Sequence, residues 1–345
     1  MNALTHQIRI HAGRRLQMLG YVTGVMDALS KAARQHGAII LMYHSVADGD
    51  VGRYVDQRNR VSADVFESQM AFLATRRTVI ALSDLLATLG SGKDPPDGAV
   101  VITFDDGYLD TLTTAAPVLQ QYGFPATLFL PTGYIDRAEP QWADQVYSTF
   151  RFRRWDRLVW RASSAGQQFD LGDRRGREAA YRFVCADLLT ASAEVRRDLL
   201  AQMRDQLRPD CNLPRLTMSW NDVRRLVREY PGFSIGGHTV EHLDLTNMSL
   251  DRAGREISTC RDHLDDRLGH APRCFSFPYG RSLPELRRLV EQSGFRSSCG
   301  GGHGAVVTTG SDRFALPRVE APPSMRRFDL LTNPANAGIW RRLGR

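Results

Sequence analysis

An apolar run that ends in two adjacent acidic residues is the feature that most restricts how this chain can fold. The run from Val100 to Phe104 is rich in β-branched residues, and Asp105, Asp106 and Gly107 follow it directly. Such a run is typical of a buried strand, whose C-terminal end would then carry both carboxylates. Two unpaired negative charges cannot enter an apolar core. The pattern therefore favours either a cation bound beside the pair or a solvated turn or helix N-cap.

Two histidines four residues apart follow a second short strand. An apolar stretch from Phe233 to Ile235 and a pair of glycines precede His238 and His242. On one helical turn this spacing places both imidazoles on the same face, where they can chelate one divalent ion. Together with Asp106 they form a set of one carboxylate and two imidazoles with coordination positions left open, which is typical of catalytic metal sites. Zinc is the first choice for such a set, and cobalt, nickel and manganese are alternatives.

Segments with strand and helix patterns alternate along much of the chain. Residues 38–43 and 126–130 are predicted to be strands, and residues 62–73 and 111–122 to be helices. This alternation predicts a parallel α/β architecture. In such folds functional sites gather at the carboxyl ends of the strands, where the acidic pair and the histidine pair both fall.

Three motifs in a fixed order give the chain a family resemblance. Residues 103–108 (TFDDGY), 238–242 (HTVEH) and 275–280 (FSFPYG) resemble the first three motifs of the polysaccharide deacetylases, the NodB-type, metal-dependent carbohydrate esterases. The resemblance covers residues 38–320 and implies an α/β fold, a distorted (β/α) barrel with fewer than eight regular units and a helical insertion. The opening at residues 43–46 and the long insert look like a bacterial branch associated with surface or exopolysaccharide synthesis.

The resemblance also implies roles for individual residues. Asp106, His238 and His242 would hold the divalent metal ion. Asp105 would be the catalytic base that takes the proton of the attacking water. The backbone N–H of Tyr279 would stabilise the oxyanion beside the metal.

Two family positions differ in this chain. Many members carry an arginine in the third motif to hold the base, whereas Ser276 stands there. Arg318, near the end of a late strand, is the candidate replacement, and the alternative is an ordinary surface arginine. The family's late histidine, the acid toward the leaving amine, has no clear counterpart. His303 in a glycine-rich stretch and His44 at the end of the first strand are the candidates; without them the reaction would depend on water or the substrate itself.

Composition suggests the domain boundaries. We expect an N-terminal helical segment at residues 1–36, a barrel over residues 37–325 with a helical insert at about 137–217, and a basic C-terminal tail at residues 326–345. Residues 296–312 are glycine-rich and are predicted to form a mobile loop. The aromatic residues of the insert are expected to form its own core, with a stacking wall for sugar rings as the alternative. They are Trp142, Tyr147, Phe150, Phe152, Trp155 and Trp160.

Charge and cysteine content restrict partners and location only broadly. The formal charge of +7 suits an anionic partner or a membrane surface, but no recognition motif accompanies it, so no nucleic-acid partner is expected. Five cysteines without CxxC spacing are typical of free thiols in a reducing compartment. Neither a secretory signal nor a spanning apolar run is evident, so the prediction is a cytoplasmic protein. Residues 1–36 could contact the inner membrane surface, or pack on the barrel instead.

The predicted function is metal-dependent removal of N-acetyl groups from amino-sugar residues of an oligo- or polysaccharide of the N-acetylglucosamine type. The substrate could be lipid-linked or nascent, and the role would lie in surface or exopolysaccharide synthesis. Two alternatives stay open: a non-catalytic carbohydrate-binding member of the family, and a hydrolase of a non-sugar amide or ureide on the same fold.

Overall fold

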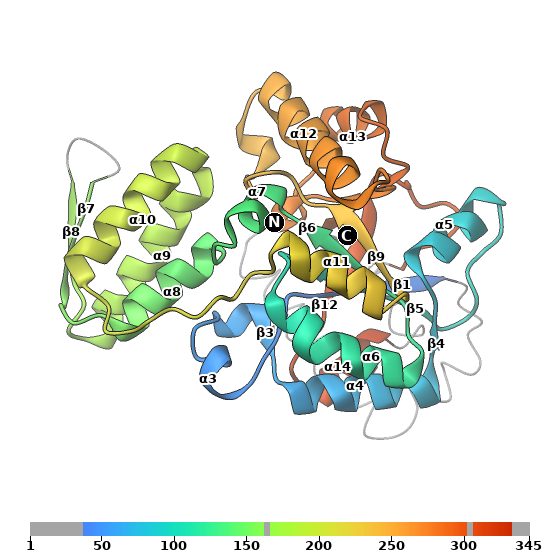
Figure 1. Cartoon of the computed structure of the whole chain (residues 1–345), viewed down its shortest axis with the longest axis horizontal. Helices are drawn as coiled ribbons and strands as arrows, with labels where there is room; N and C mark the ends of the chain where they lie inside the picture. Colours follow the sequence, from blue (N-terminus) through green and yellow to red (C-terminus); the bar gives the residue numbers. More distant parts are fainter. Residues whose placement is uncertain (1–36, 162–165, 302–305, 333–345) are drawn as a thin grey trace, which may run out of the picture.

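The computed structural model of the chain describes residues 37–161, 166–301 and 306–332. Its centre is a ring of parallel strands with helices on the outside (Figure 1). The ring strands are β1 (Ala38–Tyr43), β5 (Ala99–Asp105), β6 (Ala126–Leu130), β9 (Phe233–Gly237), β10 (Cys274–Ser276), β11 (Ser297–Gly301) and β12 (Leu316–Glu320). The surrounding helices are α4 (Ala63–Arg76), α5 (Leu82–Gly90), α6 (Ala116–Tyr122), α7 (Thr132–Arg137), α11 (Trp220–Glu229), α12 (Leu250–Leu268), α13 (Pro284–Gln292) and α14 (Met325–Thr332).

Seven parallel strands close the ring in the order β1, β12, β11, β10, β9, β6, β5 and back to β1. Strand β1 pairs with β5 along one edge and with β12 along the other, so the sheet has no open edge there. The short strand β4 (Thr78–Val79) pairs with the beginning of β5, below the point where β6 joins the same edge. The predicted distorted (β/α) barrel with fewer than eight regular units is thereby confirmed.

Side-chain alternation along β5 separates the barrel interior from its helical coat. Ala99 and Val101 belong to the interior apolar cluster, to which α5 adds Leu82 and Leu85. The intervening residues pack outward with the helices; they are Val100, Ile102 and Phe104. Because alternate residues of a strand share a face, Asp105 belongs to the inward series and stands at its carboxyl end. The interior is therefore apolar near the strand starts and charged near the strand ends.

Polar side chains fix where several helices begin. The Ser62 hydroxyl accepts the Val65 N–H at the start of α4. Ser219 and Asp222 form a reciprocal capping box at the start of α11. Such caps satisfy backbone N–H groups that have no partner within the helix, so they define the helix boundaries locally.

The insert forms a lobe beside the barrel (Figure 1). It consists of α8 (Trp142–Phe152), α9 (Arg174–Thr190) and α10 (Ala193–Leu207), with an antiparallel hairpin of β7 (Arg157–Trp160) and β8 (Gln167–Asp170). The sequence predicts helices here but not the hairpin, whose strands are only four residues long. Trp142, Phe150 and Trp160 are buried in the core of the lobe, as expected, whereas Trp155 is 58% exposed.

Two other segments differ from the sequence predictions. Residues 297–301, predicted to lie in a loop, form strand β11, because β10 and β12 supply backbone partners on both sides regardless of the glycine content. The predicted boundary of the basic tail falls inside α14, which begins at Met325. Phe328 of that helix is fully buried, and its ring packs edge-on against Phe72 of α4.

Some predictions fall outside the described residues. The N-terminal segment 1–36, most of the tail and His303 belong to this group. Within the described ranges, no helix is long and apolar enough to cross a bilayer.

Asp144 of α8 connects the lobe to the barrel. Its Oδ2 accepts the Tyr108 hydroxyl at 2.6 Å, and its Oδ1 accepts the backbone N–H of Asp56 at 3.0 Å. Complete burial raises the pKa of this carboxyl to about 7, and the nearby charges of Asp106 and Asp56 act in the same direction. The connection therefore includes a carboxyl group that titrates near neutral pH.

We expect Asp144→Asn to remove a pH-dependent loss of stability. The pKa of the Asp144 carboxyl is about 7 in the folded protein and has its ordinary value of 3.8 in the unfolded chain. The protonated carboxyl therefore contributes its full stabilisation of the fold below pH 3.8, and this contribution is lost as the pH rises through about 7. At about pH 8 the free energy of unfolding of the variant should be about 1–3 kcal/mol higher than that of wild type, and this difference should shrink toward about pH 5. Urea titrations across this range measure it, with exposed Asp198→Asn as the control. Identical pH slopes for wild type and Asp144→Asn would contradict the prediction.

Candidate active site

The backbone at the end of β5 sends two neighbouring carboxylates in different directions. Asp106 has φ of 72°, and Gly107 has φ of 68°, so the chain turns sharply through the left-handed region. A Cβ at Gly107 would lie 2.6 Å from Ile135 Cδ1, which leaves room only for glycine. Asp105 consequently stays inside the barrel, while Asp106 faces the loop that follows β9.

Asp105 is held by a buried arginine from the opposite end of the chain. Arg318 of β12 donates from Nη1 to Asp105 Oδ1 at 2.7 Å and from Nη2 to Oδ2 at 2.5 Å. The same guanidinium donates to the hydroxyls of Ser276 and Thr103, and its Cζ lies 5.3 Å from the centroid of the Phe129 ring. Burial alone would raise the pKa of Asp105, but the charge and the hydrogen bonds of Arg318 outweigh it and hold the pKa below its usual value. The arginine therefore keeps this carboxylate ionised and oriented.

The structure brings together the three predicted metal ligands. One ligand atom each from Asp106, His238 and His242 lies within 4.8 Å of the others, and all three side chains are buried. His242 Nε2 is 3.1 Å from Asp106 Oδ1, and His238 Nε2 is 3.6 Å from the same oxygen. The four-residue spacing predicts that the two histidines lie on one helical turn, and this prediction is wrong. They flank an irregular loop with Thr239 and His242 at positive φ, so tertiary contacts make them converge.

Contacts from neighbouring elements fix the shape of this loop. Glu256 of α12 accepts the backbone N–H groups of Val240 and Glu241 through one carboxylate oxygen, at 3.0 and 2.9 Å. From α7, the N–H groups of Thr132 and Gly133 donate to loop carbonyls. The loop is therefore anchored on both sides without adopting a repetitive conformation.

The outer nitrogens of both histidines have partners. His238 Nδ1 lies 2.7 Å from the carbonyl oxygen of Ser276, which can only accept, so Nδ1 carries the proton. Burial lowers the pKa of His238 to about 4, so the ring is neutral and Nε2 has a free lone pair. His242 Nδ1 lies 3.1 Å from the Tyr279 hydroxyl, which also donates to the His242 carbonyl. We accordingly assign the Nδ1 proton to His242 as well.

A divalent cation fits this arrangement. Asp106 Oδ1 is buried without a hydrogen-bond partner among the described residues, and two imidazole lone pairs point at it. Three electron-pair donors this close repel one another unless a positive charge lies between them. One carboxylate and two neutral imidazoles match the ligands that zinc and similar ions prefer.

The other predicted site residues lie close by or outside the described ranges. His44 is half-buried at the end of β1, near enough that its charge lowers the pKa of Asp105 and Asp106. Tyr279 has φ of 59°, the residue is 37% exposed, and its ring meets that of His242 edge to face. His303 lies in residues 302–305, which the structure does not describe. The oxyanion and acid roles remain predictions.

Sequence reasoning missed three contributors to the site. The sequence places Trp142 in the insert's own core, with a stacking wall for sugar rings as the alternative, and Arg196 is one arginine among many in its segment. Glu256 lies on an amphipathic helix with no motif around it. The partners of Trp142 and Arg196 lie 137 and 46 positions away, and those of Glu256 lie 15 and 16 positions away on a different element, so no local pattern could identify these residues.

Comparison with known proteins agrees with the fold. Residues 92–171 and 183–298, more than half of the chain, match the family described as polysaccharide deacetylase. The chain therefore belongs to the polysaccharide deacetylase family, as its three motifs predict, and to the hydrolases that remove acetyl groups.

Individual relatives are distant in sequence. YxkH of Bacillus subtilis, which is named for the same family, is 22% identical over 287 residues, or 83% of this chain and 72% of that protein. The poly-beta-1,6-N-acetyl-D-glucosamine N-deacetylase of Escherichia coli K12 is 27% identical over 129 residues, or 36% of this chain and 18% of that enzyme. The solved structure of the Streptococcus pyogenes deacetylase PplD, in complex with acetate, has the same fold, with a TM-score of 0.56 at 17% identity over 87% of this chain and 96% of PplD.

Proposed function

We propose that this protein is a metal-dependent N-deacetylase of amino-sugar residues in a bacterial oligo- or polysaccharide of the N-acetylglucosamine type. The observation that carries the proposal is the open set of Asp106, His238 and His242 beside Asp105, a carboxylate clamped by a buried arginine. The match to an Escherichia coli enzyme named for poly-beta-1,6-N-acetyl-D-glucosamine supports this class of substrate. A role in surface or exopolysaccharide synthesis and a lipid-linked substrate are parts of the same proposal.

The metal ligands would hold a divalent ion, zinc in the first instance. When bound, such an ion supplies Lewis-acid polarisation of the water and of the acetyl carbonyl. The protein prepares the site in advance, because Ser276 and Tyr279 fix both imidazoles with their Nε2 atoms facing Asp106. A site that is ordered before the substrate arrives spends little free energy on reorganisation during the reaction.

Asp105 would take the proton from the attacking water. Its Oδ2 lies 3.7 Å from His238 Nε2, so the carboxylate borders the site where the water would bind. Arg318 occupies one lone pair on each carboxylate oxygen and fixes the plane of the group, which leaves the remaining lone pairs to accept the proton. The Tyr279 N–H would donate to the developing oxyanion, and His44 or His303 would give a proton to the leaving amine.

Metal-dependent acetate release is the direct test. Purified full-length protein should release acetate from N-acetylglucosamine oligomers with zinc or cobalt, and a chelator should abolish the release. His238→Ala should lower the rate about 10²-fold or more, because a Lewis acid contributes several kcal/mol to transition-state stabilisation. The control is His270→Ala, which removes an exposed histidine after α12.

Two results would contradict the proposal. One is release that is insensitive to both the chelator and His238→Ala. The other is no release from any N-acetylated oligomer by a protein that retains zinc; activity on cyclic amides or ureides would then favour the non-sugar alternative.

A further inference from the structure

Two buried side chains of the insert contact the metal ligand His242 or its hydrogen-bond partner Tyr279. Arg196 comes from α10 and Trp142 from α8. Neither residue belongs to the three motifs. The barrel therefore supplies the metal ligand His242, and the insert supplies some of the contacts that hold this residue in place.

Arg196 is buried without an acidic partner. It is 2% exposed, and the ion pairs among the described residues do not include it, although its neighbour Arg197 pairs with Glu241. Its Nε donates to the Leu188 carbonyl at 3.0 Å and its Nη1 to the His242 carbonyl at 3.3 Å. Burying a cation without a carboxylate is costly, so these two hydrogen bonds must offset part of the free energy of desolvating the guanidinium.

Trp142 connects the same arginine to the ligand ring. The Arg196 guanidinium lies 5.2 Å from the Trp142 ring centroid, within range for a cation–π contact. The indole Nε1–H donates to the Tyr279 hydroxyl at 2.9 Å, and that oxygen lies 3.1 Å from His242 Nδ1. The Tyr279 and His242 rings also meet edge to face, with centroids 4.9 Å apart. Both the carbonyl and the ring of His242 are thus held through the insert.

The conformation of His242 explains why it needs such support. Its φ is 48°, a left-handed conformation that costs free energy for a residue with a side chain. The surrounding structure must therefore hold the residue in place. Loss of these contacts would let the backbone relax and the imidazole turn away from Asp106.

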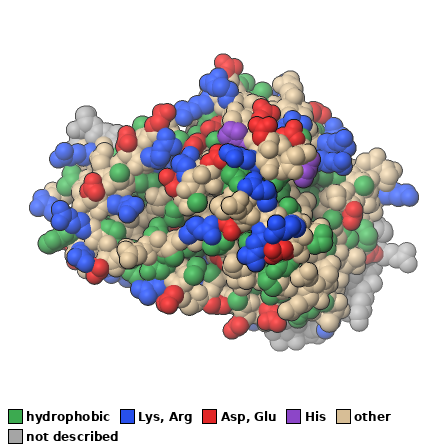
Figure 2. All heavy atoms as spheres, in the orientation of Figure 1, with side chains coloured by type: hydrophobic (Ala, Val, Ile, Leu, Met, Phe, Trp, Pro, Cys, Tyr) green, Lys and Arg blue, Asp and Glu red, His purple; other side chains and the backbone are tan. Residues whose placement is uncertain are grey.

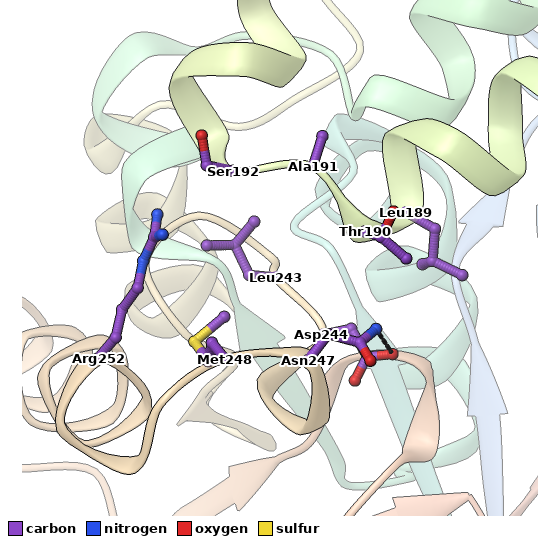
Figure 3. Close-up of a pocket in the computed structure, with 9 residues that line it drawn as sticks. All are labelled: Leu189, Thr190, Ala191, Ser192, Leu243, Asp244, Asn247, Met248 and Arg252. Atoms are coloured by element: carbon purple, nitrogen blue, oxygen red, sulfur yellow. Dashed lines mark hydrogen bonds between the residues drawn. The ribbon is translucent and has the colours of Figure 1, made fainter. Parts of the chain in front are cut away.

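A pocket next to this junction shows that the lobe and the loop face each other there (Figure 3). Residues 189–192, at the turn between α9 and α10, line one side, and Leu243, Asp244 and residues of the following segment line the other. The pocket volume of about 40 Å³ suits a few water molecules. The lobe and the segment after His242 therefore meet at this junction.

We propose that Arg196 and Trp142 are positioning residues for the metal ligand His242, which makes the helical insert a structural part of the metal site. The inference rests on the proposed function, since it takes Asp106, His238 and His242 as ligands. It goes beyond that function because it assigns the insert a role in metal affinity. Docking of the lobe and metal binding are then coupled, so each stabilises the other.

Metal affinity of the full-length protein tests the inference without an activity assay. The zinc dissociation constant of metal-free protein is measured by competition with a chromophoric chelator for wild type, Trp142→Phe and Arg196→Met. Each variant should bind zinc about 10-fold or more weakly, the range seen when partners of metal ligands are removed. Arg196→Lys keeps the charge but not the forked arrangement of N–H donors, so its zinc affinity should lie between those of wild type and Arg196→Met. In the cobalt-loaded variants, the visible absorption bands should shift, because they report ligand geometry.

Matched controls separate positioning from general damage to the lobe. Trp160→Phe removes another buried indole of the insert core, one that donates to Asp187 at 2.6 Å, away from His242. Arg204→Met removes an exposed arginine from the same helix as Arg196. Both should bind zinc as wild type does. If Arg196→Met fails to fold, Trp142→Phe decides the question.

Two outcomes would overturn the inference alone. One is an unchanged zinc affinity in Trp142→Phe and Arg196→Met, and the other is an equal loss of affinity in Trp142→Phe and Trp160→Phe. Failure of the wild-type protein to bind zinc or cobalt would overturn the proposed function as well. The failures of the two proposals are therefore distinguishable.

Discussion

Asp105→Asn is expected to lower acetate release about 10²- to 10⁴-fold, the range that general-base catalysis contributes. The asparagine keeps the shape of the side chain, and its oxygen can still accept one hydrogen bond from Arg318. It cannot take a proton from water. The metal ligands are untouched, so zinc affinity should stay close to that of wild type, and this separates the variant from His238→Ala.

The measurement compares initial rates of acetate release at saturating zinc. Asp262→Asn, an exposed substitution on α12, is the matched control and should leave the rate unchanged. A thermal unfolding curve confirms that Asp105→Asn is folded. A folded, zinc-loaded variant that retains a rate close to wild type would rule out Asp105 as the base.

Arg318→Met is expected to destabilise the fold by about 3–5 kcal/mol, because it leaves a buried carboxylate without its partner. The side chains of Arg318 and Asp105 are only 1% and 3% exposed, so water cannot replace the lost hydrogen bonds. The methionine fills much of the volume of the arginine stem but donates nothing to Asp105, Ser276 or Thr103. Activity should fall too, since the base loses its orientation.

Urea unfolding of wild type, Arg318→Met and the Asp105→Asn/Arg318→Met double variant measures this effect. The double variant should recover part of the stability, because neutralising both partners removes the uncompensated charge. Arg313→Met is the control; this arginine is 62% exposed and pairs with an exposed glutamate. If Arg318→Met lowers the free energy of unfolding no more than the control does, the buried ion pair contributes little to the stability of the fold.

The clamp on Asp105 also explains a departure from the family pattern. Many family members carry an arginine in the third motif, where this chain has Ser276. The Ser276 hydroxyl accepts a hydrogen bond from Arg318 Nη2 at 2.7 Å, so the serine lies against the arginine that enters from β12. A guanidinium can thus reach the carboxylate from a different strand of the same ring. Closure of the barrel brings the carboxyl ends of β10 and β12 to the same end of the ring, so an arginine on either strand can reach Asp105.

Local sequence predicted a parallel α/β architecture, which the family resemblance narrowed to a distorted barrel, and it placed Asp105, Asp106, His238 and His242 at strand ends. It could do so because the strand signal, the positions of the acids and the spacing of the histidines all lie within short stretches. Alternation along β5 also settles that Asp105 points inward with Val101. These are properties that a chain carries before it folds.

The partners of those residues were decided by the tertiary structure. Arg318 lies 213 positions from Asp105, and Trp142 lies 137 positions from Tyr279. The histidines converge in an irregular loop held by α7 and α12 rather than on a helical turn, and the insert supplies Arg196 to the His242 carbonyl. The physical reason is that a residue's type and spacing encode its local conformation and the face it presents. Which distant group meets that face depends on how the ring closes and how the lobe docks.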